Sequence, residues 1–159
     1  MKQGVKAILI FLGCFLLWGV PGWLIAADAD KPEENIELKF YNAAKEGKVN
    51  RVKAMLANGV NVNAKNPSGR TALMGAAYYG NRKIVRELIV EGVDVNQADE
   101  QGKTALMLAV ANQRLDVVED LLYAGADVKL EDKNKNTALK IAEKTKNKEL
   151  TKLLESATE

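Results

Sequence analysis

The chain reads TALM at residues 71–74, TALM again at 104–107 and TALK at 137–140, so the motif returns every 33 residues. A fixed period of this length is the signature of a repeat architecture, in which each unit is one supersecondary structure. Two further sets of small residues follow the same step of 33, namely Gly59, Gly92 and Gly125, and Ala43, Ala76, Ala109 and Ala142.

Each unit is predicted to form a helix, a tight turn, a second helix and an extended loop. In the second unit, the hydroxyl of Thr71 can cap the first helix, because it accepts a hydrogen bond from a free backbone N–H group. Gly80 can take a positive φ and end that helix, and Gly92 can do the same for the second helix over residues 81–91. The second helix carries one apolar stripe, formed by Ile84, Val85, Leu88 and Ile89.

One unit cannot be stable alone. Full burial of a large apolar side chain contributes about 1.5–3 kcal/mol, whereas ordering the backbone costs about 1–2 kcal/mol per residue. A 33-residue unit has too few apolar side chains to offset that cost. Stacking of neighbouring units must supply the difference, which is the principle of a solenoid.

These residues resemble the ankyrin repeat, whose 33-residue unit opens its first helix with a T-P-L-H-x-A signature. The resemblance covers about residues 34–155. It implies an all-α fold, an ankyrin-repeat solenoid of about four helix–turn–helix units with extended loops. An N-terminal signal segment is predicted to precede the solenoid. The predicted repeats are about 34–65, 66–98, 99–131 and 132–155.

The chain departs from the signature at several places. Alanine stands in the proline place, and methionine or lysine in the histidine place, so the usual threonine–histidine bond between units is absent. The first unit has Leu38 where the threonine belongs, and the last has Lys135 in a glycine place. In the third unit Gln113 replaces the glycine between the helices. We therefore expect either that Asn112 takes the left-handed conformation there or that the turn is reshaped.

Residues 1–29 have the pattern of a secretory signal peptide. A basic start with Lys2 and Lys6 precedes the uncharged stretch 7–27, and small residues follow it, with an A-x-A pattern at 27–29. Cleavage is expected after Ala26, Ala27 or Ala29, which assigns the ankyrin repeat domain to 30–159.

Two alternatives for this segment remain. It is long enough to be an uncleaved membrane anchor, although Pro21 and its flanking glycines interrupt the span. Lipid modification of Cys14 is the other alternative. With cleavage, the exported chain has no cysteine, which suits an oxidising compartment. The expected localisation is therefore the bacterial periplasm, or the membrane, with the repeats outside the cytoplasm, if the segment is retained.

Composition excludes most catalytic chemistry. The sequence has no histidine and one cysteine, which removes the commonest general base and metal ligand. Its formal net charge is +2, too small for a dedicated nucleic-acid binder. Asp116, Glu119 and Asp120 are interpreted as solvated charge on a second helix. We therefore predict no enzyme activity and no catalytic, metal or cofactor site, and neither nucleic acid nor a small molecule as a ligand.

The resemblance implies binding of another protein through the concave face, which comprises the loop tips and the exposed face of the first helices. Tyr79 and Arg70 are the predicted anchors, because aromatic and arginine side chains dominate binding hot spots. The eight lysines within 129–152 are interpreted as a solvated cap. The full candidate set is Lys45, Glu46, Pro67, Ser68, Arg70, Tyr78, Tyr79, Glu100, Gln101, Lys103, Ala111, Asn112, Lys133, Asn134, Asn136, Lys144 and Thr145.

Three other functions stay open from the sequence. The chain could be an immunity or inhibitor protein that neutralises a toxin or an enzyme. It could be a membrane-tethered adaptor if residues 1–29 are retained. An enzyme that uses carboxylates, tyrosine or lysine would need a pocket with converging titratable groups, and the sequence indicates none.

Overall fold

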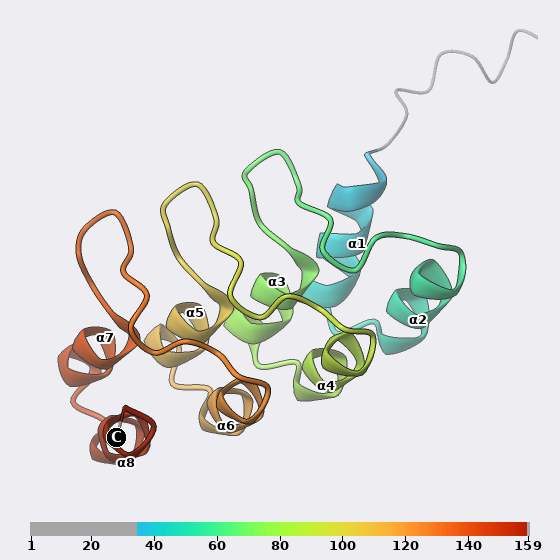
Figure 1. Cartoon of the computed structure of the whole chain (residues 1–159). Helices are drawn as coiled ribbons and strands as arrows, with labels where there is room; N and C mark the ends of the chain where they lie inside the picture. The colour runs from blue at the N-terminus through green and yellow to red at the C-terminus, as the bar shows by residue number, and fades with distance from the viewer. Residues whose placement is uncertain (1–34, 159) are drawn as a thin grey trace, which may run out of the picture. The chain divides into compact units, whose positions relative to one another are not determined.

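The computed structural model describes residues 35–158, whose helices are arranged in pairs. The first helix of each pair lies in one row and the second in another, and the loops between pairs project beyond the first row (Figure 1). Within the described residues there are eight helices and no strands, which confirms the predicted all-α ankyrin-repeat solenoid. The helices are α1 Ile36–Lys45, α2 Val49–Ala57, α3 Ala72–Tyr79, α4 Arg82–Val90, α5 Ala105–Ala111, α6 Leu115–Tyr123, α7 Ala138–Thr145 and α8 Lys148–Ser156.

The first helices begin at the predicted threonine caps. The hydroxyls of Thr71, Thr104 and Thr137 each accept a hydrogen bond from the backbone N–H three residues on, at 3.3 Å. The first repeat lacks this threonine and starts its helix earlier. There the side chain of Asn35 accepts from the N–H of Leu38 at 2.8 Å, so the same capping chemistry comes from another residue.

The turn between the two helices corrects one expectation. Gly80 has the predicted left-handed conformation, with φ +78°. In the third repeat, however, Asn112 has φ −101°, and it is Gln113, in the glycine place, that has φ +55°. The side-chain amide of Asn112 donates to the carbonyl of Leu108 at 2.8 Å. The same place has a positive φ in all four repeats, at Gly47, Gly80, Gln113 and Lys146, so the shared backbone geometry of the turn sets the conformation and Gln113 adopts it in place of glycine.

The core lies between the helix rows and is thickest in the middle repeats. Residues 72–77 of α3 and 105–110 of α5 are all buried, because each of these helices packs against both neighbouring repeats. In α7 the buried residues are Ala138 and Ala142. The fourth repeat therefore has the solvated outer side that a terminal unit needs.

Polar side chains join neighbouring repeats, although the threonine–histidine bond of the family signature is missing. The amide of Asn81, at the start of α4, donates to the carbonyls of Ala44 and Lys45 at 2.8 and 2.9 Å. One repeat later, Arg114 Nε donates to the carbonyl of Tyr78 at 3.4 Å. Each bond ties a second helix to the end of the preceding repeat's first helix.

The loop asparagines also link repeats. The side-chain oxygen of Asn63 accepts a hydrogen bond from the backbone N–H of Asp94 at 2.8 Å. The side-chain oxygen of Asn96 accepts one from the N–H of Asp127, also at 2.8 Å. Each of these side chains therefore holds the next loop in register.

The predicted signal segment, residues 1–29, lies outside the described residues. Among residues 35–158, no helix has both the length and the apolar character that crossing a membrane requires.

Candidate protein-binding face

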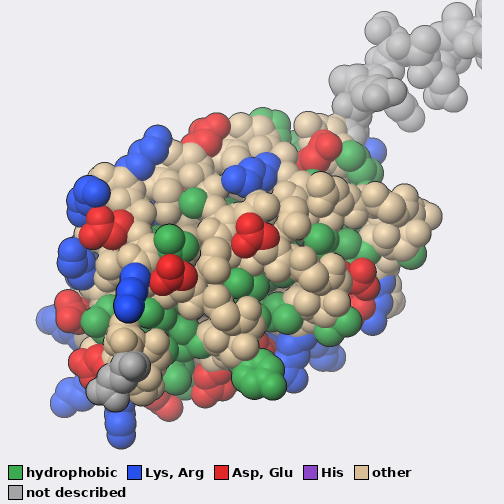
Figure 2. All heavy atoms as spheres, viewed as in Figure 1, with side chains coloured by type: hydrophobic (Ala, Val, Ile, Leu, Met, Phe, Trp, Pro, Cys, Tyr) green, Lys and Arg blue, Asp and Glu red, His purple; other side chains and the backbone are tan. Residues whose placement is uncertain are grey.

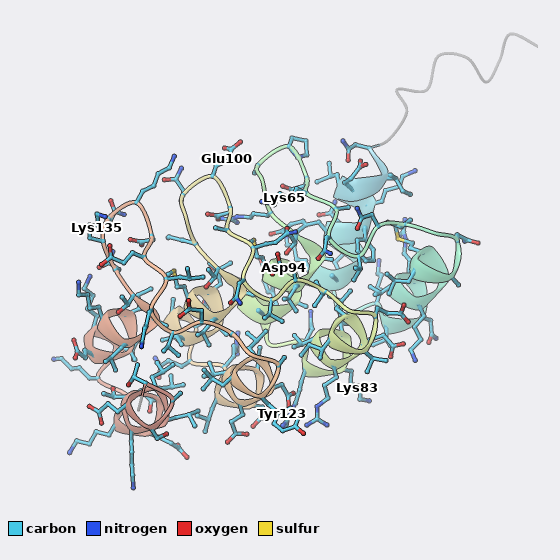
Figure 3. All side chains as sticks on the ribbon, in the orientation of Figure 1. Lys65, Lys83, Asp94, Glu100, Tyr123 and Lys135 are labelled. Carbon is cyan, nitrogen blue, oxygen red and sulfur yellow. The ribbon has the colours of Figure 1, made fainter. Side chains whose placement is uncertain are left out.

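The structure places the loop candidates at the tips of three successive loops. These tips lie beyond the row of first helices, where Figure 3 labels Lys65, Glu100 and Lys135. They are open to solvent, and their exposed predicted residues are Pro67 and Ser68, Glu100 and Gln101, and Lys133 and Asn134.

One buried side chain holds each loop. Asn66, Asp99 and Asp132 each accept two backbone hydrogen bonds, from the residues two and four positions further along, at 2.8–3.0 Å. The second and third of these loops are joined by the backbone bond from the N–H of Lys133 to the carbonyl of Gln101 at 3.0 Å. The tips are therefore preformed, and a partner that binds them has little backbone entropy to remove.

An aromatic pair lies at the end of α3. The rings of Tyr78 and Tyr79 have centroids 4.9 Å apart and planes inclined at 57°. Their exposed fractions are 39% and 44%, so both side chains are partly open to solvent. Lys45 Nζ lies 5.6 Å from the centroid of the Tyr79 ring, within the range of a cation–π contact.

Arg70 lies beside this face but already has partners. Its Nε donates to the buried carboxylate of Asp99 at 3.3 Å. The pKa of Arg70 is raised above its ordinary value. The main cause is a hydrogen bond with Tyr41, and the hydrogen bond and charge of Asp99 contribute less. The side chain remains partly exposed. Arg70 is therefore a positioned cation on the face, and it also joins three successive repeats.

Tyr41 is the residue on this face that the sequence interpretation missed. It occupies the place of the buried Met74 in the next repeat, 33 residues on, and that place reads as core. A Cβ added to Gly75 would lie 2.9 Å from the Tyr41 ring. A glycine inside a helix is unusual and marks a close approach, so Gly75 was the signal that could have revealed this contact.

The other predicted binding residues differ in whether their side chains already have a hydrogen-bond or ion-pair partner. Asn112 uses its amide N–H to cap its own helix. Lys103 has no carboxylate within ion-pair distance among the described residues. The pKa of the nearby Asp132 is lowered, mainly by a backbone hydrogen bond from Asn136, with a smaller contribution from Lys103. Lys144 Nζ donates to the side chain of Asn136 at 2.6 Å.

From the sequence, three acidic residues of α6 are interpreted as solvated charge, and the structure contradicts this for Asp120. Asp120 accepts hydrogen bonds from both Arg82 and Arg86 at 2.7–3.1 Å, and its side chain is 12% exposed. Burial would raise its pKa, but the two arginines outweigh burial and lower the pKa to about 2. The prediction was wrong for Asp120 because the arginines come from α4, one repeat away. Asp116 and Glu119 are exposed.

Within residues 35–158 no group of three or more Asp, Glu, His or Cys side chains is arranged to hold a metal ion. The site that the described residues do present is a rigid surface with exposed aromatic and cationic side chains.

A family model described as ankyrin repeats (3 copies) matches residues 40–132, which is more than half of the chain. The chain therefore belongs to the ankyrin repeat family. Its repeats indicate a protein–protein interaction module of a typically non-catalytic class. No curated protein matches the chain.

Proposed function

We propose that the repeats bind a partner protein through the concave face, in a compartment outside the cytoplasm. The observation that carries the proposal is the exposed pair Tyr78–Tyr79, which is fixed at the end of α3 with Lys45 against the Tyr79 ring. Tyrosine offers a large amphipathic contact area at a low cost in side-chain entropy, which makes it frequent at binding hot spots.

The surroundings of the pair favour a preformed docking surface. The loop tips are held by internal hydrogen bonds, and Arg70 is oriented by Asp99. A partner therefore meets side chains whose positions do not depend on its binding. Such preorganisation increases affinity because less order has to be created on association.

The test is affinity capture from the envelope of the source organism, followed by measurement of the captured protein's dissociation constant. Tyr79→Ala should weaken binding by about thirtyfold, the effect of losing a hot spot worth about 2 kcal/mol. Tyr123→Ala is the matched control, since it removes an exposed tyrosine from the second-helix row. Equal affinity of wild type and Tyr79→Ala would remove the concave face from the proposal. An assay of the captured protein's activity then separates a scaffold from an inhibitor.

The compartment is tested separately. The signal pattern of residues 1–29 supports export. Mass spectrometry of the protein from its native cell should find an N-terminus at Ala27, Asp28 or Asp30. A retained Met1 in a membrane fraction would instead support the tethered adaptor, and a full-length cytoplasmic chain would contradict export.

A further inference from the structure

Three exposed positions of α4 recur on α6, in the next repeat, with opposite charge or matching apolar character. Val90 is 81% exposed and Tyr123 97%, although both are large apolar side chains. The two other positions are basic on α4 and acidic on α6. The equivalent pairs, each 33 residues apart, are Lys83 and Asp116, Arg86 and Glu119, and Val90 and Tyr123.

These residues form one surface, which we call the outer face. Their spacing of i, i+3 and i+7 places them along one side of each helix. Figure 3 shows Lys83 and Tyr123 beneath α4 and α6, on the side away from the loops. Figure 2 shows hydrophobic side chains at this lower edge, with basic side chains to one side and acidic ones to the other.

We propose that the outer face binds a second copy of this chain. A two-fold axis parallel to the helices, between α4 and α6, would lay α4 of one copy on α6 of the other. Because the residues are equivalent, they meet at the same height along the helices. Val90 then faces Tyr123, Lys83 faces Asp116 and Arg86 faces Glu119, each contact occurring twice, as an isologous interface requires.

The charges needed for this contact are available to different degrees. Lys83 is exposed and has no carboxylate within ion-pair distance in the part of the chain that the structure describes. Asp116 is exposed and lies 3.6 Å from Arg82, a loose pair that leaves one carboxylate oxygen open. Arg86 is already paired with Asp120 at 2.9 Å. The Lys83–Asp116 contact between copies should therefore contribute most of the electrostatic specificity.

The expected dimer is weak. The helices α4 and α6 have nine residues each, so each is about 14 Å long. Two such helices present less area than the roughly 800 Å² per partner of a standard interface. We expect a reversible dimer with a dissociation constant of roughly 10–100 µM.

The experiment is analytical ultracentrifugation of the protein purified from cells that express it. It measures the oligomeric state over concentrations from about 5 to about 500 µM. Wild type should pass reversibly from monomer to dimer. Lys83→Asp and Asp116→Lys should each weaken dimerisation about tenfold, since each places like charges at both symmetry-related contacts. Tyr123→Asp should abolish it. Circular dichroism checks that every variant is folded.

The deciding measurement mixes the two charge variants. Lys83→Asp and Asp116→Lys should associate with each other as tightly as wild type associates with itself, because opposite charges then face each other at both contacts. The matched controls Lys135→Asp and Glu100→Lys carry the same charge reversals on the loop tips and should dimerise like wild type (Figure 3). The proposal is overturned if wild type stays monomeric throughout, or if it associates but the mixture does not recover. Tyr79→Ala should leave dimerisation unchanged, so this result is independent of the concave face.

Discussion

The helices α5 and α7 hold equivalent places in the third and fourth repeats, but they are buried to different extents. Every residue from Ala105 to Val110 is buried in α5, whereas α7 buries Ala138 and Ala142. The first turns are nearly identical in sequence, TALM at 104–107 and TALK at 137–140. Local sequence therefore sets the helix, and the presence of a following repeat sets how much of it is buried.

The largest expected effect comes from the same substitution in the two helices. Leu106→Ala should lower the free energy of unfolding by about 2–5 kcal/mol, because Leu106 is fully buried on a helix that packs against both neighbouring repeats, and the loss leaves a cavity. Leu139→Ala, at the equivalent half-buried place, should cost about 1–2 kcal/mol. Urea denaturation measures both. Equal losses would mean that the fourth repeat is as tightly packed as the third.

The second effect concerns Asp120 of α6, which forms ion pairs with Arg82 and Arg86 of α4. Among the described residues, no equivalent ion pair joins α6 to α8. Asp120→Asn should cost about 1–2 kcal/mol at neutral pH. The exposed arginines are screened by solvent, so the loss is smaller than the pKa shift alone implies.

The same substitution predicts a pH dependence. The folded pKa of Asp120, about 2, is below its ordinary value of 3.8. Its stabilisation is therefore fully present above pH 3.8 and is lost as the pH falls toward 2. Thermal unfolding of wild type and Asp120→Asn should converge across this interval. A constant difference down to pH 2 would contradict the assignment.

The smallest effect compares two strained turns. Gln113 and Lys146 have φ of +55° and +58° at places where the first two repeats have glycine. Lys146→Gly should stabilise the chain by about 1 kcal/mol, because glycine adopts this conformation without strain. Gln113→Gly should gain less, since Gln113 also accepts a hydrogen bond from Asn147 at 3.3 Å. Thermal unfolding measures both, and destabilisation by Lys146→Gly would show that its backbone is not strained.

Much of the fold could be predicted from the sequence because its determinants are local. The capping hydroxyl of Thr71 bonds three residues away, and the apolar stripe of the second helix lies within three turns. The exposed tyrosines were found for the same reason, since Tyr78 and Tyr79 end a helix whose preceding residues are all small or apolar.

The contacts that were missed all join residues about one repeat apart. Asp120 meets Arg82 across 38 residues, and Tyr41 lies against Gly75 across the first interface between repeats. Periodicity identified equivalent positions, but which side chains meet depends on how far each reaches into the neighbouring repeat. Arg70, predicted as an anchor for the partner, is held by Asp99 for that reason.

The 33-residue period by itself determined the class of fold, the helix pairs and their caps, because these follow from backbone geometry and short-range hydrogen bonds. The tertiary structure decided which charges are neutralised and which aromatic rings stay open to solvent. It also set the surface formed by α4 and α6 together, since the burial and pairing of a side chain depend on its neighbours in space.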